Sequence, residues 1–96
     1  MSDSDSIIKL LENVGVDPDS CEEIDGYKIF DLYDYDNFNE VYNNLERMLD
    51  VEKDSDNSSI DIENAHIVYI YKDMLVELVA IFDDDNYSLN IFEGEN

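Results

Sequence analysis

The chain has 96 residues, of which 26 are Asp or Glu and 5 are Lys or Arg, so its formal net charge at pH 7 is -21. This length fits a single acidic domain spanning residues 1–96 and excludes two cores joined by a linker. Disorder is also excluded, because Ile, Leu, Val and Phe supply 29 of the 96 residues, more than the roughly 20 % share below which chains stay unfolded.

The first part of the chain predicts a helix followed by a strand. Apolar residues recur at helical spacing from Ile7 to Val14, and Gly15 offers a left-handed stop. Asp25-Gly26 is typical of a two-residue turn, and it precedes a strand at residues 27–32. The residues before the turn, SCEE, are weak strand formers, which leaves open a full hairpin or only a turn into one strand.

A second helix is predicted over residues 38–50. Its apolar positions are 38, 41, 42, 45, 48 and 49, which fall on one helical face. We expect Asn37 to be its N-cap and Glu40 to complete a capping box, because residues 35–37 break the pattern. Residues 50–64 are polar and acidic and predict a loop.

Three strands are predicted in the last third of the chain, in the runs AHIVYIY, MLVELVAIF and YSLNIFE. They are rich in β-branched and aromatic residues and the gaps between them are short, which favours an antiparallel meander. The middle run is almost wholly apolar, as in a central strand covered on both faces. The expected fold class is therefore α+β, with two helices packed on an antiparallel sheet of about four strands in the order α-β-α-β-β-β.

The chain lacks the residues that most enzyme sites need. It has one His, one Cys and three Gly, with no glycine-rich loop and no Cys pair. His66 lies in an alternating strand, where a surface or core imidazole is the expected role, and Cys21 lies among acids that disfavour its thiolate. We expect no catalytic activity and no cofactor.

Residues 54–65, DSDNSSIDIENA, partly match the pattern of a calcium-binding loop. Asp54, Asp56 and Ser58 fall at positions one, three and five, but Ser59 stands where the turn needs Gly. Ala65 stands at position twelve, where a bidentate Glu is required. We therefore expect no dedicated metal site.

The compartment expected is the cytoplasm of a bacterial or archaeal host cell. The acidic start MSDSDS does not resemble a signal peptide, no apolar run reaches membrane-spanning length, and the lone Cys21 indicates a reducing environment. Halophilic adaptation would also give many acids, but ten Ile, ten Asn and two Ala fit an AT-rich genome better.

Acidic residues gather in clusters, one of which alternates with aromatic rings in DLYDYD. Solubility needs a net charge of only about 2 to 8 for a small domain, so the excess favours a strongly cationic partner. The carboxylates could bind Lys and Arg side chains of a partner protein that normally bind nucleic-acid phosphates. The Tyr rings either stack on Arg side chains of that partner or cover the edge of this chain's own core. We expect the sheet to hold the contact residues more rigidly than the loop 50–63 could hold its acids. The candidate partner-binding residues are Asp31, Tyr33, Asp34, Tyr35, Asp36, Asp83, Asp84 and Asp85.

In size, charge and clusters such as DLYDYD and FDDDNY, the chain resembles small acidic phage- or plasmid-encoded inhibitors that mimic nucleic acid, including anti-CRISPR and anti-restriction proteins. The resemblance implies a non-catalytic inhibitor that docks in the cationic DNA- or RNA-binding channel of a nuclease or CRISPR effector. Neither free nucleic acid nor a membrane is an expected partner, because both are polyanionic. An immunity protein against a basic nuclease toxin is the alternative, and an acidic adaptor or chaperone of histone-like proteins is a third reading.

Overall fold

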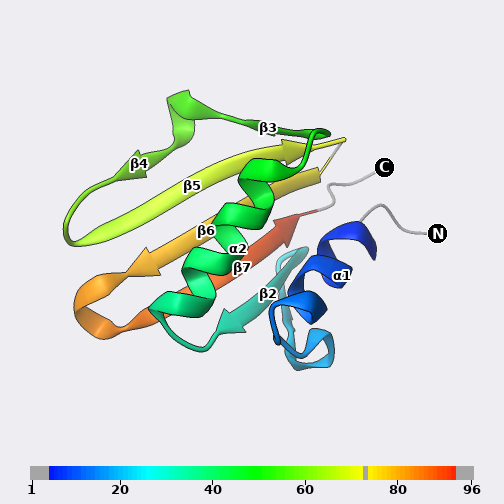
Figure 1. Cartoon of the computed structure of the whole chain (residues 1–96), viewed down its shortest axis with the longest axis horizontal. Coiled ribbons are helices and arrows are strands. Elements are labelled where there is room, and N and C mark those ends of the chain that lie inside the picture. Colours follow the sequence, from blue (N-terminus) through cyan, green and yellow to red (C-terminus); the bar gives the residue numbers. More distant parts are fainter. Residues whose placement is uncertain (1–4, 73, 93–96) are drawn as a thin grey trace.

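The structure is a computed structural model that describes residues 5–72 and 74–92. Two helices lie over one face of an antiparallel sheet (Figure 1). The helices are α1 (Asp5–Asn13) and α2 (Tyr35–Arg47), with single 3₁₀ turns at η1 (Pro18–Ser20), η2 (Ser55–Asn57) and η3 (Phe82–Asp84). The strands are β1 (Glu22–Ile24), β2 (Tyr27–Leu32), β3 (Val51–Lys53), β4 (Ser59–Ile60), β5 (Asn64–Tyr71), β6 (Met74–Ile81) and β7 (Asn86–Phe92).

The sheet has seven strands in the order β1-β2-β7-β6-β5-β3, and β4 pairs with β5. The expectation of about four strands in the order α-β-α-β-β-β is therefore wrong. The three additional strands, β1, β3 and β4, are only three, three and two residues long. Segments this short show no readable alternation, and they are ordered by pairing with the edges of the longer strands β2 and β5.

The hydrophobic core lies between the two helices and one face of the sheet. The buried residues of α1 and α2 pack against alternate residues of β2, β5, β6 and β7. On β6 the residues that face the helices are Met74, Val76, Leu78 and Ala80, all buried. The prediction that both faces of this central strand are covered is wrong, because the residues between them point to the face without helices. We call that second face the open face.

The helix boundaries follow from their caps. α1 ends as the sequence indicates, and Gly15 has the positive φ of a left-handed stop, 88°. α2 begins at Tyr35 rather than at residue 38, because the N-cap is Asp34. The Asp34 carboxylate accepts a hydrogen bond from the Asn37 backbone N–H at 2.8 Å, so Asn37 lies inside the first turn and is not the cap.

A complete hairpin joins β1 to β2. Asp25 and Gly26 both have positive φ, 52° and 87°. A two-residue turn needs these angles to match the right-handed twist of the two strands that it joins. Ile24 and Tyr27 are paired across the turn. At Gly26 an added Cβ would lie 3.0 Å from Cε1 of Phe92, so this position needs Gly for both its backbone angle and its space.

Candidate functional site

The two candidate acidic segments lie at one end of the sheet, where β2 leads into α2 and where β6 turns into β7 (Figure 1). The end of β2 pairs with the start of β7, with Asp31 opposite Ser88 and Leu32 opposite Tyr87. This pairing brings residues 31–36 close to residues 82–87 although about fifty positions separate them. We call these two segments together the acidic end.

Aromatic rings connect the two segments of the acidic end. The centroid of the Tyr87 ring lies 6.3 Å from that of Tyr35, 5.5 Å from that of Phe38 and 6.3 Å from that of Phe82. Phe38 and Tyr87 are buried, whereas the Tyr35 residue is 51 % exposed. Because the rings pack the start of α2 against the β6–β7 turn, the backbone segments that carry the carboxylates are joined to each other.

Asn37 anchors the first turn of α2 and was missed as a site residue. It is 7 % exposed. Its amide Nδ2 donates to the Val14 carbonyl at 3.0 Å, and its Oδ1 accepts from the Tyr33 backbone N–H at 3.2 Å. These bonds tie the β2–α2 junction to the loop that follows α1. Asp34 therefore has a structural role as the cap, with its Oδ1 directed at the helix.

Asp85 also has a structural role. It ends η3 with a φ of 53°, in the left-handed region. Burial raises the pKa of the Tyr87 hydroxyl, and so do its hydrogen bond to the Asp85 carboxylate and the negative charge there. The Asp85 carboxylate is thus already engaged, in contrast to its neighbours Asp83 and Asp84.

Four carboxylates of the acidic end are available to a partner. Asp31, Asp36, Asp83 and Asp84 are exposed, and their side chains make no hydrogen bond or ion pair with another described residue. Tyr33 is 63 % exposed, and its hydroxyl accepts from the Asp17 backbone N–H at 3.4 Å. Both Tyr33 and Tyr35 therefore present ring surface to solvent beside carboxylates.

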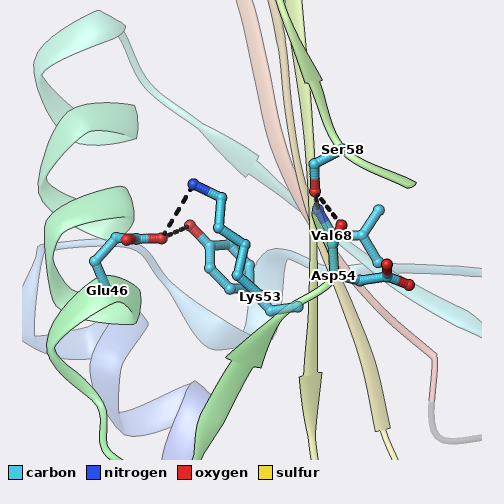
Figure 2. A network of polar contacts seen from close by, with 6 residues as sticks. Glu46, Lys53, Asp54, Ser58 and Val68 are labelled. Carbon is cyan, nitrogen blue, oxygen red and sulfur yellow. Dashed lines mark hydrogen bonds and ion pairs between the residues drawn. The ribbon is translucent and has the colours of Figure 1, made fainter. Parts of the chain in front are cut away.

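The acidic residues between α2 and β5 are held more firmly than a loop would hold them. The Asp54 backbone N–H donates to the Val68 carbonyl at 2.8 Å, and the Val68 N–H donates to Ser58 Oγ at 2.9 Å (Figure 2). Ser58 Oγ in turn donates to the Asp54 carbonyl at 2.7 Å. The expectation that residues 50–64 form a loop is wrong, because β3 and β4 pair with β5 and the residues around η2 are hydrogen-bonded to it.

A polar network links this segment to α2. Glu46 of α2 turns toward Lys53 of β3 (Figure 2), with 3.7 Å between Lys53 Nζ and Glu46 Oε2. The same carboxylate oxygen accepts a hydrogen bond of 2.7 Å from the hydroxyl of Tyr69, whose residue is 1 % exposed. Burial raises the pKa of Tyr69 above its ordinary value of 10.0, and the Glu46 hydrogen bond and charge raise it further.

His66 and Cys21, the other two side chains considered for chemistry, both contact neighbouring residues of the fold. His66 projects from the open face with its Nε2 3.4 Å from Oε2 of Glu77, and Cys21 is half-buried against the core. In residues 5–72 and 74–92, no group of three or more His, Cys, Asp and Glu is placed to hold a metal ion. No helix of the described chain is long and apolar enough to span a membrane.

Comparison of the chain with models of protein families found no match, and comparisons with curated proteins and with solved structures found none. Its function therefore has to be argued from the geometry of the acidic end and of the open face.

Sequence reasoning named the carboxylates of the acidic end but missed the residues that support them. Phe38 and Tyr87 were visible only as apolar positions of a helix and of a strand. No spacing rule indicates that they meet, because their contact depends on the pairing of β2 with β7. Asn37 was expected to be the N-cap of the helix, which is wrong, and its role in joining Tyr33 to Val14 follows from hydrogen bonds that only the folded chain makes.

Proposed function

We propose that this chain is a non-catalytic inhibitor that imitates nucleic acid and docks by its acidic end in the cationic DNA- or RNA-binding channel of a defence nuclease or CRISPR surveillance complex. The observation that carries the proposal is the convergence of two acidic segments around one aromatic cluster. Asp31, Asp36, Asp83 and Asp84 offer unpaired charge there, and Tyr33 and Tyr35 offer ring faces.

A cationic channel that binds phosphates also fits this arrangement chemically. Carboxylates on a rigid support can accept charge-assisted hydrogen bonds from Arg and Lys, and exposed Tyr rings can stack on guanidinium planes. Steering by a net charge of -21 would speed association with such a channel at low salt. The place of action proposed is the cytoplasm of an infected cell, where such effectors work.

Competition with nucleic acid tests the proposal. A labelled duplex would be incubated separately with each of four nucleic-acid-binding effectors, and the chain would then be added. The effectors are a guide-loaded single-subunit CRISPR nuclease, a multisubunit CRISPR surveillance complex, a type I restriction enzyme and a basic nuclease domain of a bacterial toxin. The chain should displace the duplex from one of the first three effectors and should not bind the duplex itself. Displacement from the toxin nuclease alone would establish the immunity-protein alternative, and displacement from none of the four would contradict the proposal.

A matched pair of variants locates the contact. Changing Asp36, Asp83 and Asp84 to Asn should weaken inhibition at least about a hundredfold, because close charge pairs at interfaces couple by ~1.5 kcal/mol or more. Asp34 stays unchanged in this variant because it caps α2. The control removes the same number of charges elsewhere, through Glu12→Gln, Asp50→Asn and Asp56→Asn, and it should inhibit almost as the unchanged chain does.

A further inference from the structure

A continuous line of apolar side chains crosses the open face from β1 to β5. Strand pairing places Ile24 beside Tyr27, Tyr27 beside Phe92, Phe92 beside Leu75 and Leu75 beside Ile70. Adjacent strands lie about 4.8 Å apart, so the line extends for roughly 19 Å. We call these five residues the apolar row.

The apolar row is accessible to a partner. Ile24 at one end is 50 % exposed and Ile70 at the other is 41 % exposed, while the three residues between them are half-buried. The Tyr27 and Phe92 rings lie with their centroids 4.8 Å apart, and the Phe92 ring extends over Gly26. Single exposed apolar residues are ordinary, whereas contiguous apolar residues rimmed by charged ones are typical of interaction surfaces.

The charges around the apolar row all have one sign. Glu52 is paired with Ile70 at the end of the row. Glu22 and Glu77 lie on the neighbouring row, opposite Ile29 and Asn90, about 6.6 Å further along the strands. Asp31 follows one row beyond, toward the acidic end. The open face is therefore continuous with the acidic end.

No Lys or Arg projects from the open face, and the described residues include all five. Lys28 and Lys53 are paired with Ile91 and Tyr69, which face the helices. The other three are Lys9 and Arg47 on the helices and Lys72 in the β5–β6 turn, with its Nζ 5.3 Å from the centroid of the buried Tyr71 ring. The His66 imidazole is already beside Glu77.

We propose that the open face docks an amphipathic, cationic segment of the partner protein. Apolar side chains of that segment would lie on the apolar row, and its Lys or Arg side chains would reach Glu22, Glu52 and Glu77. The row is as long as about three to four turns of helix at 1.5 Å per residue. This inference rests on the proposed function, since it describes a second contact with the same cationic partner.

Charge selects this occupant over a second copy of the chain. Two open faces packed together would bring Glu22, Asp31, Glu52 and Glu77 of each copy into one interface without any Lys or Arg to pair them. Like charges that lose water without a cationic partner strongly disfavour such an interface. A basic amphipathic segment neutralises the same carboxylates.

The direct test is a titration of the isotopically labelled chain with a synthetic amphipathic helical peptide of Lys and Leu, followed by NMR. Amide signals of Ile24, Leu75 and Ile70 should shift and saturate. A peptide of the same charge with Ser in place of Leu should bind at least about tenfold more weakly, because it cannot bury the apolar row. Absence of binding, equal binding of both peptides, or shifts confined to α1 and α2 would overturn the inference.

Matched variants sharpen this test. Ile24→Thr with Ile70→Thr should weaken binding of the Lys and Leu peptide about tenfold. Ile60→Thr with Ile62→Thr removes two apolar residues that are 61 % and 93 % exposed. Ile60 is paired with Ala65, which faces the helices, and Ile62 lies in the β4–β5 connection, so this variant should bind as the unchanged chain does. Light scattering that shows a dimer, dispersed by Ile24→Thr with Ile70→Thr, would assign the face to a second copy and contradict the inference.

The two proposals fail separately. If the peptide binds the open face but no effector is displaced from nucleic acid, the mimicry function is wrong and the docking chemistry stands. If displacement depends on Asp36, Asp83 and Asp84 but the peptide does not bind the apolar row, the further inference is wrong and the function stands.

Discussion

At the scale of single residues, Asp34 shows how a carboxylate in an acidic cluster can serve the fold. It accepts from the Asn37 backbone N–H at 2.8 Å and so satisfies one of the free donors at the start of α2. Asp34→Ala should lower the free energy of unfolding by about 1 kcal/mol in urea titrations. Asp36→Ala, two positions on, loses only a favourable dipole interaction and should cost less; an equal loss for both would argue against the cap.

Tyr69 gives the protein a pH dependence at the alkaline end. Its pKa is raised above 10.0 because the hydroxyl is buried and bonded to Glu46. The neutral phenol is therefore favoured in the folded state, so its contribution is complete below pH about 10 and is lost as the pH rises further.

Tyr69→Phe tests this account. At neutral pH it should cost about 1 kcal/mol, through the lost hydrogen bond. Above pH about 10 its stability should fall less steeply than that of the unchanged chain. Tyr33→Phe, at a 63 % exposed position, is the control and should retain the steep alkaline loss. Parallel alkaline curves for Tyr69→Phe and the unchanged chain would refute the role of Tyr69.

At the scale of elements, the β1–β2 hairpin depends on Gly26. Gly26→Ala should destabilise the fold by about 1–3 kcal/mol, because φ is 87° and the new Cβ would lie 3.0 Å from Phe92. Gly15→Ala is a matched control, since φ is 88° but nothing lies within 4 Å of the added Cβ. Thermal unfolding should show a larger loss at Gly26, and equal losses would mean that the Phe92 ring moves aside freely.

The elements also show what the sequence can predict. Helical spacing identified α1, the Asp25-Gly26 turn indicated β2, and runs rich in β-branched and aromatic residues identified β5, β6 and β7, because each of these elements is long enough to show its composition or spacing. The start of α2 was misplaced because Asn37 and Asp34 are both common cap residues by type, and only the hydrogen bond from the Asn37 N–H to Asp34 shows which of them caps the helix. The sequence left β1 open as the first arm of a hairpin, and the structure forms it; β3 and β4 could not be predicted, since their order comes from pairing with β5.

The same limit applies to the candidate site. Carboxylates at Asp31–Asp36 and Asp83–Asp85 could be chosen from local composition, and the pairing of β2 with β7 does bring them together. The sequence could not predict which of these carboxylates bond within the fold and which are free to bind a partner. Asp34 and Asp85 are engaged by Asn37 and Tyr87, and this depends on contacts made only in the folded chain.

At the scale of the whole molecule, the net charge of -21 opposes folding. Like charges are brought closer in the folded state than in the unfolded chain, and salt screens them within about 10 Å at 0.1 M. Raising NaCl from about 20 mM to about 500 mM at pH 7 should therefore raise the melting temperature, because the Debye length falls severalfold over this range. A melting temperature that does not change with NaCl would show that self-repulsion is weak.

The interior balances that repulsion with one hydrophobic cluster beneath both helices. Its residues come from α1, α2 and the long strands, so the acidic end and the open face belong to one sheet packed on a single core (Figure 1). A partner that binds both surfaces would neutralise the charge that destabilises the free chain. Binding should accordingly raise the melting temperature of the complex above that of the chain alone.

The most direct test of the central claim is the salt dependence of competition with nucleic acid. The inhibition constant of the chain against duplex binding by its effector would be measured from about 50 mM to about 300 mM NaCl. We predict that the inhibition constant rises steeply with NaCl concentration. The dependence of the inhibition constant on salt should be weaker for the triple variant Asp36→Asn, Asp83→Asn and Asp84→Asn than for the control variant changed at Glu12, Asp50 and Asp56. An inhibition constant that does not change with salt would contradict electrostatic mimicry.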